Sequence, residues 1–512
     1  MEQGVALGTG AMAPGDVVAV ARHRVEVTIS AEAVAAIEAA RAHVEHLAGS
    51  GRPVYGVSTG FGALATRYIE PVERAALQRS LVRSHAAGSG PAVETEVVRA
   101  LMLLRLATLC RGHSGVRLVT AQTYAAMLNA GITPLVPEHG SLGCSGDLAP
   151  LAHCALAATG EGEVFDLSGA RRPAAEALAA AGIKPLTLGE KEGLALINGT
   201  DGMLGMLVLA LADLHDLVRA ADITAAMSVE ALLGTDHVFA AELQELRPHP
   251  GQAASARNLV RLLAGSGIVA SHRTADPRVQ DAYSLRCAPQ VAGAVRDTIA
   301  HAEAVARREL GAAIDNPVVL ADGRVESNGN FHGAPVGYVL DFLAIAAADL
   351  ASMSERRTDR LLDQSRSQGL PPFLAHDPGV DSGLMIAQYT QAALVSEMKR
   401  LAVPASVDSI PSSAMQEDHV SMGWGAARKL RRSIDALGRV LAVEALAGAR
   451  ALELRAPLAP APGTAAAVAV IRERVPGIGP DRHLAPEIEA VRELVAGGEL
   501  VRAVETAIGE LE

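Results

Sequence analysis

The chain has few cysteines, and they lie far apart. Its 512 residues include four, at Cys110, Cys144, Cys154 and Cys287. This number and spacing exclude a disulfide framework and a paired zinc knuckle, so we expect four free thiols. A Walker phosphate loop, a G-x-S-x-G elbow, a His-Glu-x-x-His helix and a dinucleotide fingerprint are also absent. Their absence argues against cofactor-based hydride transfer and phosphoryl transfer.

Long uncharged apolar runs and basic runs are missing as well. No window reaches the roughly 18 uncharged apolar residues of a membrane span, and the N-terminal "MEQGVALGTGAMAPGDVV" lacks the basic-then-apolar order of an export signal. We therefore expect a cytoplasmic protein with no membrane partner. The formal net charge is −12, and no cluster of Lys or Arg forms a phosphate-binding patch. The charge argues against nucleic acid as a partner and favours small solutes.

Helical periodicity dominates the rest of the chain. In residues 31–49, apolar residues recur at three- and four-residue spacing, with Ser30 at the N-cap position and Gly49 at the C-terminal stop. Further stretches of this kind cover residues 96–110, 203–227, 291–310, 337–362 and 426–454. Alternating strand patterns are short, near residues 22–29 and 162–167. The sequence predicts an all-α fold, a long-helix bundle with small β additions.

Loops rich in glycine and proline punctuate this helical pattern. They gather in residues 50–64, 131–150 and 311–336. We place a domain boundary near residue 200. Residues 1–200 then form a loop-rich helical domain, and residues 201–512 form the central long-helix bundle with a helical tail after the proline-rich residues 456–466.

The most unusual loop is "GSLGCSGDLAPLAH", residues 140–153. A tight bend there lets the amide nitrogen of Gly146 attack the carbonyl carbon of Cys144 and close a five-membered ring. Loss of two waters, one of them from the Ser145 side chain, leaves an exocyclic methylidene, which is an electrophile. No ordinary side chain is one. A helix that begins near Asp147 would favour negative charge on the ring oxygen through its N-terminal dipole.

Other polar candidates each have an ordinary structural explanation beside the functional one. Tyr55 lies among glycines in residues 52–62, where a turn-rich connector is equally consistent. His85, after Ser84, ends a helix and suits the helix dipole. Asn198 in "LINGTDG" is explained equally well by a turn.

Gln280, Tyr283 and Arg286 recur every three residues in "QDAYSLRCAPQ". If the segment is helical, they share one face and a phenol and a guanidinium point into one cleft. A solvated face is the alternative.

Two loops place histidines beside other polar groups. "ESNGNFHGAPV", residues 326–336, carries Phe331 and His332, and "SSAMQEDHVSMG", residues 412–423, carries Gln416, Glu417, Asp418 and His419. A capping box before the following helix is the ordinary explanation of the second loop. A metal held by either histidine beside the two carboxylates would lack ligand spacing, and we predict no metal site.

Together these motifs resemble those of the histidine ammonia-lyase family over about residues 15 to 510. The matching motifs are "GSLGCSGDLAPLAH", "YGVSTGFG", "LINGT", "QDAYSLRCAPQ", "IDNP", "GNFHG" and "QEDHVSM", in the family's order. That family shares a self-made 4-methylidene-imidazole-5-one group with phenylalanine and tyrosine ammonia-lyases and aminomutases. Its precursor is more often Ala-Ser-Gly, whereas this chain has Cys144 first. Because only the backbone carbonyl of that residue enters the ring, we expect the substitution to be tolerated.

The resemblance implies catalytic roles for several of these residues. Ser145 supplies the methylidene carbon that captures the substrate's amino group, and no external cofactor is needed. Tyr55 removes a β-proton, for which a phenol with an ordinary pKa near 10 needs cations or dipoles around its anion. Tyr283 assists at the amine or orients the prosthetic group, and Arg286 holds the substrate carboxylate.

The resemblance also implies the binding site. Asn198 and Gln280 contact the prosthetic ring and the substrate, and Phe331 walls the pocket. His85 and Glu417 match the histidine-specific pattern, where Glu417 either accepts an imidazole N–H or shares proton transfer.

The expected reaction is loss of ammonia from L-histidine to give trans-urocanate, by a homotetramer whose active sites draw loops from more than one subunit. A tyrosine or phenylalanine lyase or an aminomutase is the alternative within this chemistry, and a helical scaffold without chemistry is the alternative outside it. Two departures affect pocket details: Met415 stands where many relatives have Asn, and Asp201 where many have Gln.

Overall fold

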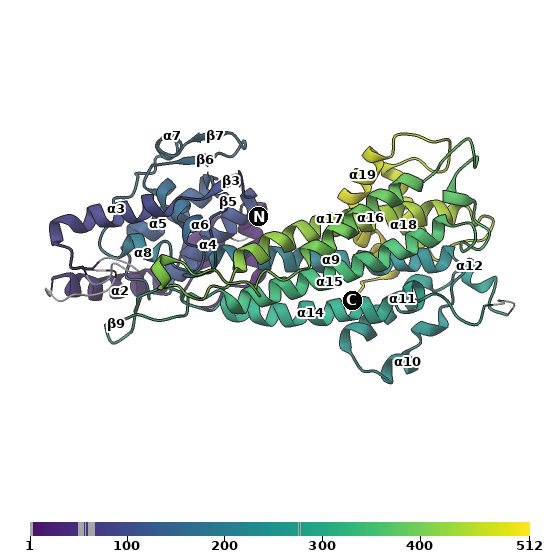
Figure 1. Ribbon diagram of the computed structural model, residues 1–512, viewed down its shortest axis with the longest axis horizontal. Coiled ribbons are helices and arrows are strands. Elements are labelled where there is room, and N and C mark those ends of the chain that lie inside the picture. The colour runs from purple at the N-terminus through teal and green to yellow at the C-terminus, as the bar shows by residue number, and fades with distance from the viewer. Residues whose placement is uncertain (1–3, 50–55, 57, 60–66, 275, 277) are drawn as a thin grey trace. The chain divides into compact units, whose positions relative to one another are not determined.

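The computed structural model describes residues 4–49, 56, 58–59, 67–274, 276 and 278–512, and it is mainly helical (Figure 1). The predicted all-α class is confirmed. The chain forms two compact units. Unit 1 comprises Met1–Leu209, Glu303–Asp341 and Pro404–Arg428, and unit 2 comprises Ala210–Ala302, Phe342–Val403 and Lys429–Glu512. The division of the chain into domains 1–200 and 201–512 stays a prediction.

Unit 1 contains short helices and small sheets. Its helices are α1 (Pro14–His23), α2 (Ala31–Gly49), α3 (Arg74–His85), α4 (Thr95–Cys110), α5 (Leu118–Asn129), α6 (Leu148–Ala158), α7 (Ala174–Ala180) and α8 (Glu192–Ala195), with 3-10 turns η2 (Pro71–Glu73) and η5 (Ser413–Met415). Its strands are β1 (Val5–Leu7), β2 (Val27–Ile29), β3 (Ser89–Ala92), β4 (Thr133–Pro134), β5 (Pro137–His139), β6 (Glu163–Phe165), β7 (Arg171–Pro173), β8 (Val318–Val319) and β9 (Val325–Glu326). They pair as β1-β2, β3-β5, β4-β6-β7 and β8-β9, of which only β1-β2 is parallel.

Long helices contain residues of both units, and shorter ones complete unit 2. The long helices are α9 (Asp201–Ala231), α14 (Ala288–Glu309), α15 (Ala334–Leu362) and α17 (Gly423–Glu453). The others are α10 (Ala241–Glu245), α11 (Pro250–Leu263), α12 (Gly267–Ala270), α13 (Tyr283–Arg286), α16 (Met385–Leu401), α18 (Pro462–Arg474), α19 (Ala485–Ala496) and α20 (Glu499–Ile508), with 3-10 turns η3 (His237–Phe239) and η4 (Pro372–Leu374).

Most local predictions are confirmed. Helix α2 begins after Ser30, whose Oγ accepts the amide of Ala33 at 3.1 Å, as an N-cap does. The five other predicted helical stretches fall in α4, α9, α14, α15 and α17, and the two strand patterns contain β2 and β6. All four cysteines are free thiols. The proline-rich interruption is shorter than predicted, because α18 already begins at Pro462, where proline suits the first helical turn.

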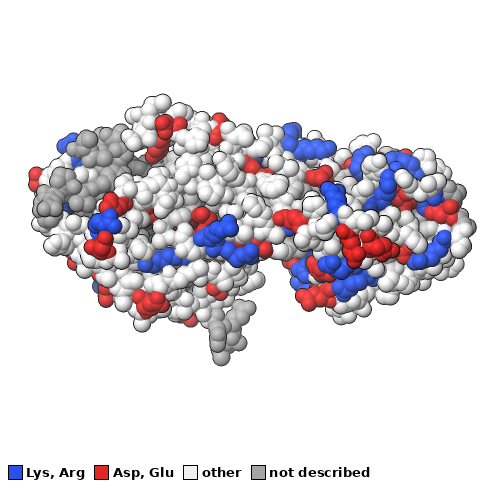
Figure 2. Space-filling view, turned by 90° about the horizontal axis from the view of Figure 1, so that it is seen from below, with Lys and Arg blue, Asp and Glu red and all other residues white. Residues whose placement is uncertain are grey.

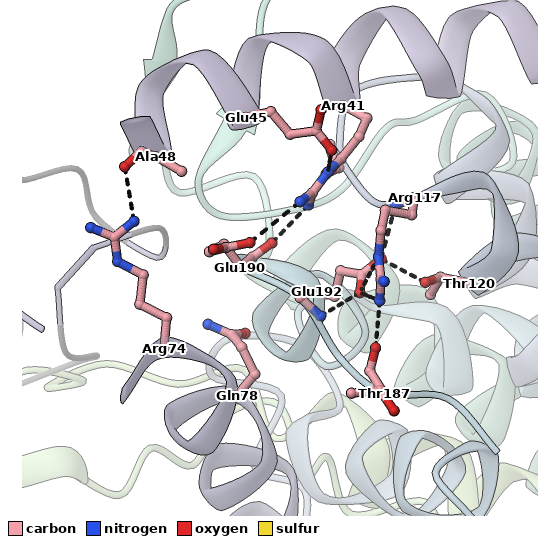
Figure 3. A network of polar contacts seen from close by, with 12 residues as sticks. Arg41, Glu45, Ala48, Arg74, Gln78, Arg117, Thr120, Thr187, Glu190 and Glu192 are labelled. Atoms are coloured by element: carbon pink, nitrogen blue, oxygen red, sulfur yellow. Dashed lines mark hydrogen bonds and ion pairs between the residues drawn. The ribbon is translucent and has the colours of Figure 1, made fainter. Parts of the chain in front are cut away.

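Unit 1 is held together near α8 by a network of ion pairs and hydrogen bonds (Figure 3). The fully buried Glu192 carboxylate accepts the backbone amide of Arg117 at 2.9 Å and the hydroxyl of Thr120 at 2.6 Å. Burial alone would raise the pKa of Glu192, but the bonds from Arg117 and Thr120 outweigh it and hold the pKa below its usual value. Gln78 on α3 accepts the amide of Gly193 at 2.8 Å. These contacts fix the chain just before Asn198.

In unit 2, α9, α15, α16 and α17 run beside one another (Figure 1). The buried Glu444 of α17 accepts hydrogen bonds from Thr224 of α9 at 2.8 Å and from Arg357 of α15 at 2.9 Å. Gln391 of α16 donates to the carbonyl of Val440 at 2.8 Å. A single α17 carboxylate therefore ties three helices of the bundle together.

Two further features of the molecule are the distribution of charged side chains on its surface and the hydropathy of its long helices. Figure 2 shows acidic and basic side chains interspersed on the face in view. Among the described residues, one helix, α15, is long and apolar enough to cross a membrane by length and composition alone, with a mean hydropathy of 1.6. Inside the fold 61% of that stretch is buried, which is typical of a core helix.

Candidate active site

The precursor turn Cys144-Ser145-Gly146 lies in unit 1, between β5 and α6. Gly146 has φ +75° and pairs with Gly199 as an isolated bridge. A Cβ at position 146 would lie 2.0 Å from the carbonyl oxygen of Gly199, so only glycine fits here. The next amide, that of Asp147, donates to the same carbonyl at 2.7 Å. The backbone is thus bent and held where the proposed ring must close.

Asp147 locks this turn to α9. Helix α6 does begin after Asp147, as predicted, but the carboxylate does not cap its own helix. Its Oδ2 accepts the amides of Gly202 and Met203, each at 2.9 Å, and its Oδ1 accepts the hydroxyl of Ser141 at 2.9 Å. Burial raises the pKa of Asp147 to about 7, although these bonds oppose the shift.

Glu417 stands beside the precursor turn. Burial, followed by the charge of this carboxylate, raises the pKa of the Cys144 thiol to about 12. Ser412 donates its hydroxyl to Glu417 Oε2 at 2.9 Å, and the two residues also pair through their backbones. The capping-box explanation of this loop is wrong, since α17 begins only at Gly423.

The chain that follows Glu417 is anchored to the stretch before Cys144. Met422 donates its amide to the carbonyl of Leu142 at 2.8 Å, and the Ser421 hydroxyl donates to the carbonyl of Gly143 at 2.8 Å. The "QEDHVSM" and "GSLGCSG" motifs, far apart in sequence, therefore form one structure.

His85 is the last residue of α3, and the charge of Glu417 acts on its pKa. Its Nδ1–H donates to the carbonyl of Leu81 at 2.9 Å, so in the neutral ring Nε2 is the acceptor. Burial lowers the pKa of His85, and the bond to Leu81 and the charge of Glu417 offset this shift only in part. The helix-end explanation is therefore correct, and it sets the tautomer that a binding role needs.

Asn198 lies in the turn between α8 and α9 and is almost fully buried. Its Nδ2 donates to the carbonyl of Leu194 at 3.2 Å, and its carbonyl accepts from the buried Arg105, which also donates to the carbonyl of Ile314 at 2.8 Å. Phe331 is half-buried in the loop before α15. Tyr55, the predicted base, lies outside the described residues.

Gln280, Tyr283 and Arg286 lie together in unit 2, where they line a cavity of about 310 Å³. The Arg286 guanidinium carbon stands 4.6 Å from the centre of the Tyr283 ring. We expected these three residues to share one face of a helix. Only Tyr283 and Arg286 lie in a helix, because α13 starts at Tyr283 and Gln280 lies in the preceding loop. The candidate residues therefore form two clusters, one in each unit.

Comparisons with known proteins agree with these motifs. The sequence model of the family described as aromatic amino acid lyase matches residues 12–473. The chain belongs to the aromatic amino acid lyase family. A histidine ammonia-lyase of Streptomyces coelicolor is 67% identical over 508 residues, 99% of each chain.

Solved structures of this lyase family share the fold. A tyrosine aminomutase from Streptomyces globisporus matches with a TM-score of 0.94 at 39% identity, over 100% of both chains. A histidine ammonia-lyase from Trypanosoma cruzi matches with a TM-score of 0.91 at 39% identity, over 99% of this chain and 96% of that one.

Sequence reasoning missed several residues that shape the site of this lyase. Ser412 and Ser421 hold the Glu417 loop through single hydroxyls, and no periodicity signals such contacts. Asp147 was expected only as a helix start. Its position directly after the precursor was the available clue to its wider role.

The turn that carries Glu417 is strained. Ser413, Ala414 and Met415 have φ values of 51°, 53° and 69°, a left-handed run of non-glycine residues. L-residues lose about 1–2 kcal/mol each in this conformation, and Asn tolerates it better than Met. Met415 therefore stands in a conformation that asparagine would adopt at lower cost.

Met415→Asn should stabilise unit 1 by up to about 1 kcal/mol, because it relieves this strain while the side chain is 67% exposed and packs little. Thermal unfolding measures the change. Met415→Leu is the control, since it keeps an apolar side chain and the strain. Equal melting temperatures for the two variants would contradict the argument.

Proposed function

We propose that this chain eliminates ammonia from L-histidine to give trans-urocanate, the first step of histidine degradation. The observation that carries the proposal is the 67% identity to a histidine ammonia-lyase over 99% of both chains. The His85 and Glu417 pair beside the precursor turn supports it. A tyrosine or phenylalanine lyase or aminomutase is less supported, because the tyrosine aminomutase match reaches 39% identity.

The residues at the turn fit the proposed prosthetic group. Gly146 is bent against Gly199 in a space that admits no side chain, and the half-buried Ser145 stands between it and Cys144. When formed from these three residues, a 4-methylidene-imidazole-5-one would supply the electrophile that turns the amino group into a better leaving group. The amide at the start of α6 and the bonds of Asp147 would hold the turn still.

His85 and Glu417 divide the work at the substrate side chain. A neutral imidazole has one N–H, and both His85 Nε2 and the Glu417 carboxylate are acceptors, so only one of them binds it. We assign the imidazole N–H to His85, because Leu81 fixes its tautomer. Glu417, whose charge raises the pKa of Cys144, is then left to share proton transfer with Tyr55.

The remaining assignments follow the family pattern. Arg286 would hold the substrate carboxylate by paired hydrogen bonds, and Tyr283 would assist at the amine. Asn198 and Gln280 would contact the ring and the substrate, and Phe331 would close the pocket. The cavity that Gln280, Tyr283 and Arg286 share supports a joint role for these three residues.

The direct test is urocanate absorbance during incubation with L-histidine. Ser145→Ala should remove nearly all of this activity, and its intact mass should lack the loss of two waters that the parent chain shows. Parallel incubations with tyrosine and phenylalanine test the alternatives. Parent-like turnover by Ser145→Ala would refute the mechanism, and an unmodified parent mass would favour a scaffold without chemistry.

His85→Leu should lower kcat/KM for L-histidine by roughly 5- to 150-fold, because an unsatisfied buried polar group costs about 1–3 kcal/mol. Since burial lowers the pKa of His85, the ring is neutral at pH 7, and its acceptor role is lost only as the pH falls through that lowered pKa. Turnover of phenylalanine, which we expect to be negligible in the parent chain, should stay unchanged or rise. An unchanged kcat/KM for L-histidine would return the imidazole contact to Glu417.

We also propose a homotetramer, whose active sites draw loops from more than one subunit, and a cytoplasmic location. Phe342 and Ile345 on α15 and Ile386 and Tyr389 on α16 are apolar yet 44–60% exposed, and exposed apolar groups of this kind mark interfaces. The two helices are neighbours, as the bond from Gln388 to Glu355 at 2.7 Å shows.

Light scattering should give four times the mass of the chain, and Ile386→Glu should lower it, since the change buries a charge in the proposed interface. Val72→Glu is the control, at a side chain that is 88% exposed in unit 1. A monomeric parent chain would overturn the assembly.

A further inference from the structure

His332 and His419 form a stacked pair of imidazole rings in unit 1. Their ring centres lie 5.7 Å apart, with 5° between the planes. His332 comes from the loop before α15, and His419 lies two residues after Glu417. None of the proposed catalytic roles uses either ring.

The hydrogen bonds of His332 define its tautomer. The amide of Ala334 donates to His332 Nδ1 at 3.3 Å, so Nδ1 carries the lone pair. Nε2 then carries the proton and donates to the carbonyl of His419 at 3.2 Å. Because both nitrogens of His332 face backbone partners, this ring is a poor metal ligand. Its geometry is that of a structural bridge between two loops.

This bridge sits where the Glu417 loop needs support. On the N-terminal side, Ser412 holds Glu417 across a strained left-handed turn. On the C-terminal side, Asp418 and His419 are exposed, the Val420 amide donates to the Ser409 hydroxyl at 3.0 Å, and bonds to the precursor loop begin at Ser421 and Met422. His332 therefore supplies a contact to the exposed stretch directly after Glu417.

We propose that His332 is a positioning residue for the reaction, which holds the carbonyl and ring of His419 and thereby fixes the Glu417 carboxylate beside the precursor turn. The inference rests on the proposed function, because it assigns His332 an effect on proton transfer by Glu417. His332 touches neither substrate nor precursor in this role. Its loss should slow the chemical step more than it weakens substrate binding.

Two substitutions separate the ring from the hydrogen bond. His332→Phe keeps a ring to stack on His419 and removes the N–H donor, while His332→Gln replaces the ring and keeps a donor at the position of Nε2. Loss of one hydrogen bond predicts a five- to tenfold lower kcat for His332→Phe, with KM for L-histidine changed less than threefold. His332→Gln should recover most of the lost kcat. His301→Phe, at an exposed histidine on α14, is the control and should match the parent chain.

A double-mutant cycle with Glu417→Gln tests whether His332 acts through Glu417. In that background, His332→Phe should cause no further loss of kcat, because the group it positions is already gone. Losses that multiply would overturn the inference, as would a rise in KM with kcat unchanged.

Intact mass and thermal unfolding complete the test without relying on turnover. His332→Phe should be lighter by two waters, like the parent chain, and should unfold within a few degrees of it. A mass without that loss would overturn the inference by placing His332 in ring formation. A parent chain without activity would overturn the proposed function together with this inference. If the parent chain is active but the two substitutions lower kcat independently of each other, this inference alone is overturned.

Discussion

The close approach of two backbone segments, at Gly146 and Gly199, is the constraint on which the site in unit 1 depends. A Cβ on Gly146 would meet the Gly199 backbone, and a Cβ on Gly199 would displace the buried side-chain ends of Asp201 and Arg105. Asp147 fastens one segment to the start of α9, and Arg105 fastens the other through the carbonyl of Asn198. The precursor turn is therefore bent by contacts made outside it, and the three residues that form it need no rigidity of their own.

Two of the buried charged groups around this contact, Arg105 and Asp147, bond mainly to the backbone. Arg105 donates to carbonyls of two loops, and Asp147 accepts amides of a third segment. A buried charge that bonds to backbone groups of several segments fixes the positions of those segments, because hydrogen bonds are directional and apolar contacts are not. Unit 2 uses the same device at Glu444, where the partners are side chains of neighbouring helices.

Local features of the sequence predicted most of the helices and the Ser30 cap of α2, because these signals lie within or directly beside the elements themselves. The free thiols followed from number and spacing. The α9 partners of Asp147 could not be predicted, because they lie more than 50 residues away in the sequence. The conformation of Met415 could not be predicted either, because it depends on a turn that the pairing of Ser412 with Glu417 closes. The residues of the site were found mainly through family motifs. Their tautomers and anchors, such as Leu81 at His85, required the structure.

The buried thiol of Cys144 has a consequence for the chemical lifetime of the protein. A thiolate adds readily to an activated methylidene, so a cysteine next to such a group threatens to inactivate it from within. With a pKa of about 12, only about one thiol in 10⁵ is ionised at pH 7. Burial and the neighbouring carboxylate thus keep the sulfur chemically silent. The thiol would therefore not add to the proposed methylidene group.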